Sequence, residues 1–117
     1  MWLKNIYRIL KFRFGGIYVA YGTKIYGGVS IGNHTRINIA SHLQNCNIGS
    51  CCAIAGRLII RDSNHYTNYL NMQSSFQRKV LKSKVSVSGK KKGKVQIGNG
   101  VWIGDSVIIL SGVSIGD

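Results

Sequence analysis

The sequence predicts an all-β fold, a parallel β-helix whose short strands follow one another around a three-sided coil. Two observations lead to this prediction: aliphatic residues recur at every sixth position, and Gly, Asn, Asp or Ser occupy many of the positions between them. Side chains two residues apart lie on one face of a strand, whereas small and polar residues allow the bends between strands. Three such bends close a coil of about 18 residues, and stacked coils bury their aliphatic side chains inside.

The clearest repeat lies at the C-terminal end, in the hexads VQIGNG, VWIGDS, VIILSG and VSIGD. Each hexad has an isoleucine, and a valine precedes it by two residues: Ile97, Ile103, Ile109 and Ile115, with Val95, Val101, Val107 and Val113. The Val-x-Ile alternation is typical of a strand with one buried face. The three residues that follow each isoleucine supply the bend to the next strand.

The N-terminal half keeps the same spacing, with one short step of five residues before Ile48: Val19, Ile25, Ile31, Ile37, Leu43, Ile48, Ile54 and Ile60. Residues one coil apart should then stack, with Ile31 under Ile48, Ile37 under Ile54 and Leu43 under Ile60, each 17 residues on. A small antiparallel barrel is the alternative, but it needs longer strands and hairpin turns that the sequence lacks. We therefore expect the β-helix domain to span residues 17–117.

The regular spacing stops at RDSNHYTNYLNM, and residues 62–94 form a long excursion loop that interrupts the domain. Long irregular segments in compact domains are usually functional or disordered. Its first half contains Tyr66, Tyr69, Met72 and Phe76, which predicts an arm that packs on a neighbouring surface. Its second half, KSKVSVSGKKKGK, predicts a flexible basic return.

Residues 1–16 form a basic N-terminal arm, predicted to be a short helix. One apolar stripe is possible on it, with basic residues on the other sides: Trp2, Ile6, Ile9 and Leu10, with Lys4, Arg8 and Lys11. Such a basic amphipathic helix can rest on an anionic membrane face. It can equally cap the open end of a β-helix, which such a stack requires. The cap is the preferred interpretation, and the two roles are compatible.

The chain is strongly basic, with 16 Lys and Arg against three acidic residues and a net charge of +13. Eight of the basic residues lie between Arg78 and Lys94, inside the excursion, and four lie in the first 13 residues. This charge attracts polyanions such as nucleic acid, acidic lipid or a phosphorylated cofactor. The run KKKGK is equally compatible with a solvated surface loop.

The sequence contains no transmembrane span and no secretory signal pattern. Its three cysteines, Cys46, Cys51 and Cys52, are odd in number and lack metal-site spacing, which favours a reduced, cytoplasmic setting. The histidines His34, His42 and His65 lie at unrelated phases of the repeat, so no metal site is expected.

The segment CNIGSCCAIAGRLIIRDSNH, the excursion, and KVQIGNGVWIGDSVIILSGVSIGD together resemble the hexapeptide-repeat acyltransferases, in particular the xenobiotic and polysaccharide O-acetyltransferase branch. The resemblance covers about residues 17–117. It implies a left-handed β-helix, a homotrimer with active sites between adjacent subunits, and acyl transfer from coenzyme A to a hydroxyl or amine. The family continues for further hexads, which implies that this chain is truncated at its C-terminus.

The resemblance also implies site residues. His65, in the NH pair before the excursion, matches the catalytic base. Trp102 and Gly104 belong to the VWIG motif beside the cofactor groove, and Asp105 follows that motif at a position that contacts acyl-coenzyme A. The chain departs from the family pattern at two bends, with Gly100 in place of Asp and Ser111 in place of Pro.

An imidazole suits the chemistry because it can remove a proton from a hydroxyl near neutral pH. No metal is needed. A covalent acyl-cysteine route is the competing mechanism. Cys46 and Cys51 are expected at bends, where they can be exposed, and Cys52 should be buried, but no histidine near them in sequence would generate a thiolate. We expect structural roles for all three.

The sequence therefore predicts an O-acetyltransferase that uses acetyl-coenzyme A and acts on a sugar hydroxyl of a surface polysaccharide or its precursor. The alternatives are a xenobiotic acetyltransferase of the chloramphenicol type and a non-catalytic polyanion-binding β-helix fragment. The expected partners are a glycan or small-molecule acceptor and two further copies of the chain. A nucleic-acid partner is not expected. The expected location is the cytoplasm, with the N-terminal arm able to contact the inner face of the membrane.

Overall fold

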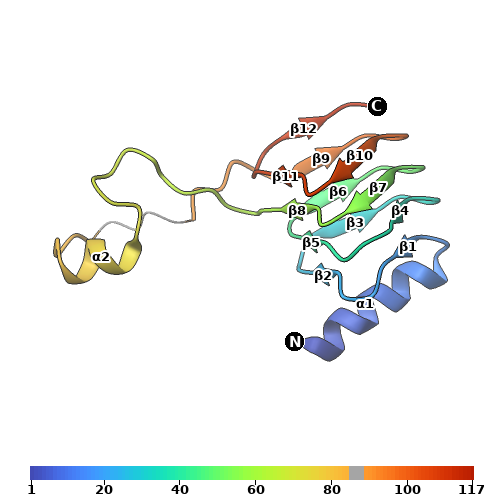
Figure 1. The fold of residues 1–117 in the computed structure, drawn as a ribbon, viewed down its shortest axis with the longest axis horizontal. Helices are drawn as coiled ribbons and strands as arrows, with labels where there is room; N and C mark the ends of the chain where they lie inside the picture. Colours follow the sequence, from blue (N-terminus) through green and yellow to red (C-terminus); the bar gives the residue numbers. More distant parts are fainter. Residues whose placement is uncertain (85–88) are drawn as a thin grey trace.

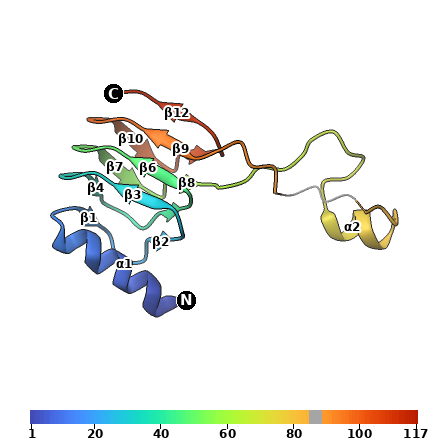
Figure 2. The same cartoon turned by 180° about the vertical axis from the view of Figure 1, so that it is seen from behind.

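The computed structural model describes residues 1–84 and 89–117 (Figure 1). It has three parts: a three-sheet body (residues 17–61 and 95–117), a helix at one end of that body, and the excursion, which projects from its side (Figures 1 and 2). Residues 85–88, in the segment predicted to be a flexible basic return, lie outside the described residues.

The body consists of three sheets, each of four parallel strands. The first has the order β1 (Tyr18–Val19), β4 (Arg36–Ile37), β7 (Ala53–Gly56) and β10 (Trp102–Asp105). The second has the order β2 (Lys24–Ile25), β5 (His42–Leu43), β8 (Ile59–Ile60) and β11 (Ile108–Ile109). The third has the order β3 (Val29–Ile31), β6 (Cys46–Ile48), β9 (Val95–Ile97) and β12 (Ser114–Ile115).

The chain visits the three sheets in turn, so that each strand pairs with the strand three places on. Ile31 pairs with Ile48 and Ile37 with Ile54, which confirms the predicted 17-residue stacking. All pairs between named strands are parallel, so the antiparallel barrel is wrong for the part of the chain that the structure describes. This arrangement is consistent with a parallel β-helix.

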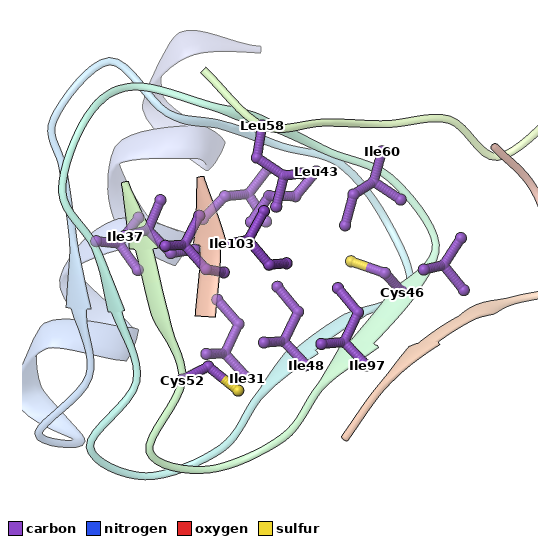
Figure 3. Packing of buried hydrophobic residues seen from close by; sticks show 14 of the residues in the cluster. Ile31, Ile37, Leu43, Cys46, Ile48, Cys52, Leu58, Ile60, Ile97 and Ile103 are labelled. Atoms are coloured by element: carbon purple, nitrogen blue, oxygen red, sulfur yellow. The ribbon is translucent and has the colours of Figure 1, made fainter. Parts of the chain in front are cut away.

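The aliphatic side chains of the repeat form one buried cluster between the three sheets. Ile37, Leu43 and Ile48, one from each sheet, point toward this common interior (Figure 3). Burial of such side chains contributes about 1.5–3 kcal/mol each relative to leaving them exposed. The aliphatic residues that recur at six-residue spacing in the sequence are therefore the ones that form the buried core.

Cys46 was expected at a bend, where it could be exposed, and that expectation is wrong. It is fully buried on β6, where it pairs with Val29. The reason is the short step of the repeat: Cys46 precedes Ile48 by two residues, so the alternation of the strand places both side chains inward. Cys46 thus occupies the place that valine takes in the C-terminal hexads, as in Val95 of the neighbouring strand β9.

Three glycines stack where the third sheet ends. Gly32, Gly49 and Gly98 follow β3, β6 and β9, and each lacks room for a Cβ. A Cβ on Gly49 would lie 2.5 Å from the carbonyl carbon of Gly98, and one on Gly32 would lie 2.6 Å from the Ser50 nitrogen. These glycines were expected to serve backbone bends. The structure adds a second requirement for glycine, because successive passes of the backbone come very close together there.

The helix α1 (Trp2–Phe14) packs on the first pass of the body, that is, on the first turn of the chain through the three sheets (β1, β2 and β3). It forms hydrogen bonds with backbone groups at the free edge of these strands. The Asn5 amide donates to the Thr23 carbonyl at 2.8 Å and accepts from the Ile25 nitrogen at 2.7 Å, as a neighbouring strand would. Arg8 donates to the Ile25 carbonyl at 2.6 Å. Because an unpaired strand edge invites association, α1 acts as the cap that the sequence favours.

The predicted apolar stripe of α1 is only partly right. Ile9 is buried against the body, but Trp2 is 74% exposed and Leu10 is 37% exposed. Asn5 and Arg8 set the orientation of the helix through their hydrogen bonds to the strand edge. A hydrophobic pattern cannot predict such polar contacts. Among the described helices, none combines the length and the apolarity needed to cross a membrane.

The excursion leaves after β8 and returns at β9. Its helix α2 (Ser74–Lys79) lies at the far end, away from the body (Figures 1 and 2). The arm is held by local contacts: Tyr66 and Tyr69 meet edge to face with ring centres 5.9 Å apart, and the Gln77 amide donates to the Asn71 carbonyl at 2.8 Å. Leu70 and Val80 remain exposed on it.

Candidate active site

Asn64 closes the root of the excursion. Its backbone and that of Lys90 form an antiparallel bridge, with nitrogen-to-oxygen distances of 2.8 and 3.0 Å. Its side-chain oxygen accepts from the Ser111 nitrogen at 3.2 Å. The two ends of a segment of about thirty residues are therefore tied to each other and to the bend after β11.

Ser111 is the second fixed point of this root. The side chain is buried; its hydroxyl accepts from the Lys92 nitrogen and donates to the Gly93 carbonyl, both at 3.0 Å. A proline at this position, as in the family pattern, would supply neither the backbone donor nor the hydroxyl. The departure from the family pattern at Ser111 is thus matched by a specific set of bonds to the returning chain.

His65 follows Asn64 directly and is exposed to solvent. Its backbone neighbour is held by the Asn64–Lys90 bridge, so the imidazole projects from a fixed point although it lies at the start of a long excursion. Lys90, which pairs with Asn64 in this bridge, brings a positive charge to the root, with its ammonium 5.2 Å from the Tyr66 ring centre, whereas Lys91 is paired with Asp62 at 3.6 Å. An accessible base beside positive charge suits an anionic substrate.

Trp102 lies on the outward face of β10 and is 75% exposed, as its position in the hexad predicts. Its partner on the adjacent strand is Ala53, a small residue that leaves the indole face uncovered. The ring extends over Gly104, where an added Cβ would lie 3.5 Å from the ring carbon Cη2. Trp102 and Gly104 together therefore present a flat apolar surface beside a bare stretch of backbone.

Asp105 forms an ion pair with Arg57 of the preceding pass, and the Arg57 Nε also donates to the Ser106 hydroxyl at 3.1 Å. Both charged side chains are substantially exposed, so the pair contributes only about 0–1 kcal/mol to stability. Its effect on the site is electrostatic, since Arg57 neutralises the carboxylate of Asp105 on the strand that carries Trp102. The sequence did not single out Arg57.

The structure brings Trp102, Gly104 and Asp105 together on one strand and leaves His65 apart from them. The strand that carries Trp102 belongs to the sheet of Ile37, whereas the excursion leaves next to Ile60, on the other side of the buried cluster (Figure 3). The structure therefore does not bring His65 and Trp102 into one site on this chain.

The other two histidines lie elsewhere. His34 is exposed at a bend with a φ of 62°. His42 lies on β5 beside Lys24, and its pKa is lowered, first by partial burial and then by the positive charges of Lys24 and Arg61. Among residues 1–84 and 89–117, no three His, Cys, Asp or Glu side chains gather in a way that could hold a metal ion.

The cysteines differ sharply in accessibility. Burial raises the pKa of the Cys46 thiol to about 12, and Cys52 is buried with its thiol 3.2 Å from the Gly98 carbonyl oxygen. Cys51 is exposed at a bend with a φ of 59°. Since the thiolate is the reactive form, Cys46 is not a nucleophile near neutral pH.

We expect a maleimide at neutral pH to label the native chain once, at Cys51, because the other two thiols are buried. Mass spectrometry should show one adduct for the native chain and three after denaturation. Cys51→Ser should remove the native adduct. Rapid labelling of Cys46 in the folded protein would contradict its burial.

Sequence reasoning missed Asn64, Ser111 and Arg57 as parts of this region. The first two could have been found in the sequence, since Asn64 adjoins the motif histidine and Ser111 departs from the family pattern. Arg57 could not have been found in this way. It pairs with Asp105, which lies 48 residues later in the sequence, only because the two parts of the chain stack on each other.

In comparisons with protein-family models, with curated proteins and with solved structures, the chain matches none of them.

Proposed function

We propose that this protein is an acetyl-coenzyme A-dependent O-acetyltransferase with a left-handed β-helix body, active as a homotrimer on a sugar hydroxyl of a surface polysaccharide or its precursor. The observation that carries the proposal is the departure of the chain from its repeat just before Asn64–His65. A root held by hydrogen bonds there presents an accessible imidazole. The three unpaired cysteines fit a reducing, cytoplasmic setting.

The separation of the candidate residues supports a site shared between copies of the chain, as in the proposed trimer. Trp102 lies on β10 of the first sheet, whereas the excursion that carries His65 leaves after β8 of the second sheet and projects from the body with exposed Leu70 and Val80 on it (Figure 1). If the excursion lies along the outward face of a neighbouring copy, it covers these side chains and brings His65 of one copy toward Trp102 of the next. Burial of apolar surface would then stabilise the same arrangement that completes the site.

His65 would act as the general base. It takes the proton from the acceptor hydroxyl as that oxygen attacks the carbonyl carbon of the thioester. The carbon–oxygen bond forms, the carbon–sulfur bond breaks, and the proton passes from His65 to the departing thiolate. The products are an acetyl ester and free coenzyme A, so the histidine returns to its starting state.

Acetyl-coenzyme A, the second substrate, is long and polyanionic, and the residues of the chain fit both properties. Trp102 and Gly104 offer a flat apolar wall for the slender arm that carries the thioester. Lys90 lies at the root of the excursion, where it can attract a phosphate group. Arg57 removes the repulsion that the Asp105 carboxylate would otherwise exert on the phosphate groups.

The test is an assay of thiol release from acetyl-coenzyme A with a panel of sugars and chloramphenicol as acceptors, with mass spectrometry of the product. We expect an acetyl ester on a sugar hydroxyl. Trp102→Ala should raise the KM for acetyl-coenzyme A roughly tenfold and change kcat less, because it removes binding surface rather than the base.

Thiol release that stays at the rate of the buffer for every acceptor would contradict the proposal. Binding to a sulfated polyanion that weakens steeply with added salt, with no thiol release, would instead indicate the non-catalytic binding module. If chloramphenicol is the only acceptor that becomes acetylated, the proposed reaction stands but the acceptor is a xenobiotic rather than a sugar.

A further inference from the structure

The outward face of α1 carries a second apolar stripe, made of Leu3, Tyr7, Leu10 and Phe14. Their spacings of four, three and four residues place them along one side of a helix. They are 75%, 68%, 37% and 89% exposed. Large side chains exposed together in this way mark an interaction surface more often than scattered ones do.

The stripe cannot turn inward without breaking the cap. Asn5 and Arg8 bind the strand edge from the other side of the helix, and Ile9 is buried against the body. Rotation of α1 to bury Phe14 would release these bonds, leave the backbone groups of the strand edge unpaired, and expose Ile9. The packing that makes α1 a cap therefore also keeps the stripe outside.

Positive charge borders the stripe. Lys4 and Lys11 follow Leu3 and Leu10 directly, and both lysines are exposed. The N-terminal half contains no carboxylate to balance them, since Asp62 is the first acidic residue of the chain. The face thus combines apolar side chains, two of them aromatic, with uncompensated cations.

A groove lies between α1 and the first pass of the body, on the side of the helix that carries Trp2 and Ile6. It has a volume of about 500 Å³, and its lining includes Tyr26 together with Lys4 and Lys24. An apolar groove with lysines among its lining residues has the same character as the stripe. The whole end of the molecule therefore offers apolar contact and positive charge side by side.

We propose that this end of the molecule docks on the surface of a membrane that contains anionic phospholipids, with α1 lying parallel to the bilayer plane. Apolar side chains enter the boundary of the acyl chains, while the lysines meet the lipid phosphates. A second copy of the chain is a poorer partner. In a symmetric contact the lysines of both copies would approach each other, and α1 has no acidic residue to pair with them.

Cosedimentation of the full chain with lipid vesicles tests the proposal. We expect binding to phosphatidylcholine vesicles that contain phosphatidylserine, and binding at least about tenfold weaker to phosphatidylcholine alone. The paired changes Leu3→Ser with Phe14→Ser, and Lys4→Glu with Lys11→Glu, should each weaken binding about tenfold or more. The matched control, Lys79→Glu with Lys82→Glu in the excursion, should bind as the unaltered chain does.

A second measurement leaves α1 intact. In Trp102→Phe, the only remaining indole is Trp2. Its fluorescence should shift to shorter wavelength with the anionic vesicles and stay unchanged with the neutral ones.

Three results would overturn the proposal: no shift of the Trp2 emission, equal loss of binding in the excursion control and in the α1 charge variant, or a stripe variant that alters only the oligomeric mass by light scattering. The last result would assign the stripe to a contact between copies.

Discussion

Replacing His65 with alanine should lower the turnover of acetyl-coenzyme A about 10²- to 10⁴-fold, the range that loss of a general base produces. The fold should remain, because His65 is exposed and the root of the excursion is held by its neighbour Asn64 and by Ser111. The measurement is thiol release with a saturating sugar acceptor, with circular dichroism and light scattering of both proteins to compare their fold and oligomeric state.

His34→Asn is the matched control for His65→Ala. His34 is another exposed histidine, and asparagine tolerates its φ of 62°. This control should keep full turnover. If His65→Ala keeps it as well, another residue is the base. If both variants lose turnover equally, the loss reflects the structure rather than proton transfer.

Gly49→Ala should destabilise the protein by about 3 kcal/mol or more, because the added methyl group would meet the backbone of the next pass at Gly98. Neither neighbour can yield easily, since the Gly49 nitrogen donates to the Ile97 carbonyl at 2.8 Å and holds the two passes together. The midpoint of urea denaturation, followed by circular dichroism, measures the effect.

The control for this change is Gly104→Ala. Gly104 also follows an isoleucine of a hexad, but a Cβ there meets only the Trp102 ring at ordinary contact distance, 3.5 Å. We expect its stability to change by about 0.5 kcal/mol or less. Equal midpoints for the two alanine variants would show that close stacking of the backbone is not what requires glycine at position 49.

The period of the sequence was sufficient to predict the parallel stacking. Ile31 and Ile48 pair as expected because a strand places every second side chain on the same face, so the spacing of buried residues reports the path of the chain directly. The same logic predicts the outward position of Trp102. Handedness, the trimer and the catalytic role of His65 come from the resemblance to a family, and they stay predictions.

Single positions that deviate from the period were harder to predict. The sequence prediction placed Cys46 in the shortened bend before Ile48. In the structure this bend ends before Cys46, because β6 already begins at Cys46. Only the pairing with Val29 shows which residue the chain left out. A one-residue ambiguity in register reverses the face of every side chain nearby, so local pattern alone cannot resolve it.

The sequence by itself determined the repeat, the buried core, the point where the chain departs from the repeat and the exposed indole. Each of these follows from the alternation of side chains along one strand. The tertiary structure decided which face of α1 meets the body, that Asn64 and Ser111 hold the excursion, and that Arg57 neutralises Asp105. These three features depend on contacts between polar groups that are far apart in the sequence and come together only when the chain folds. The local spacing of residues cannot predict such contacts.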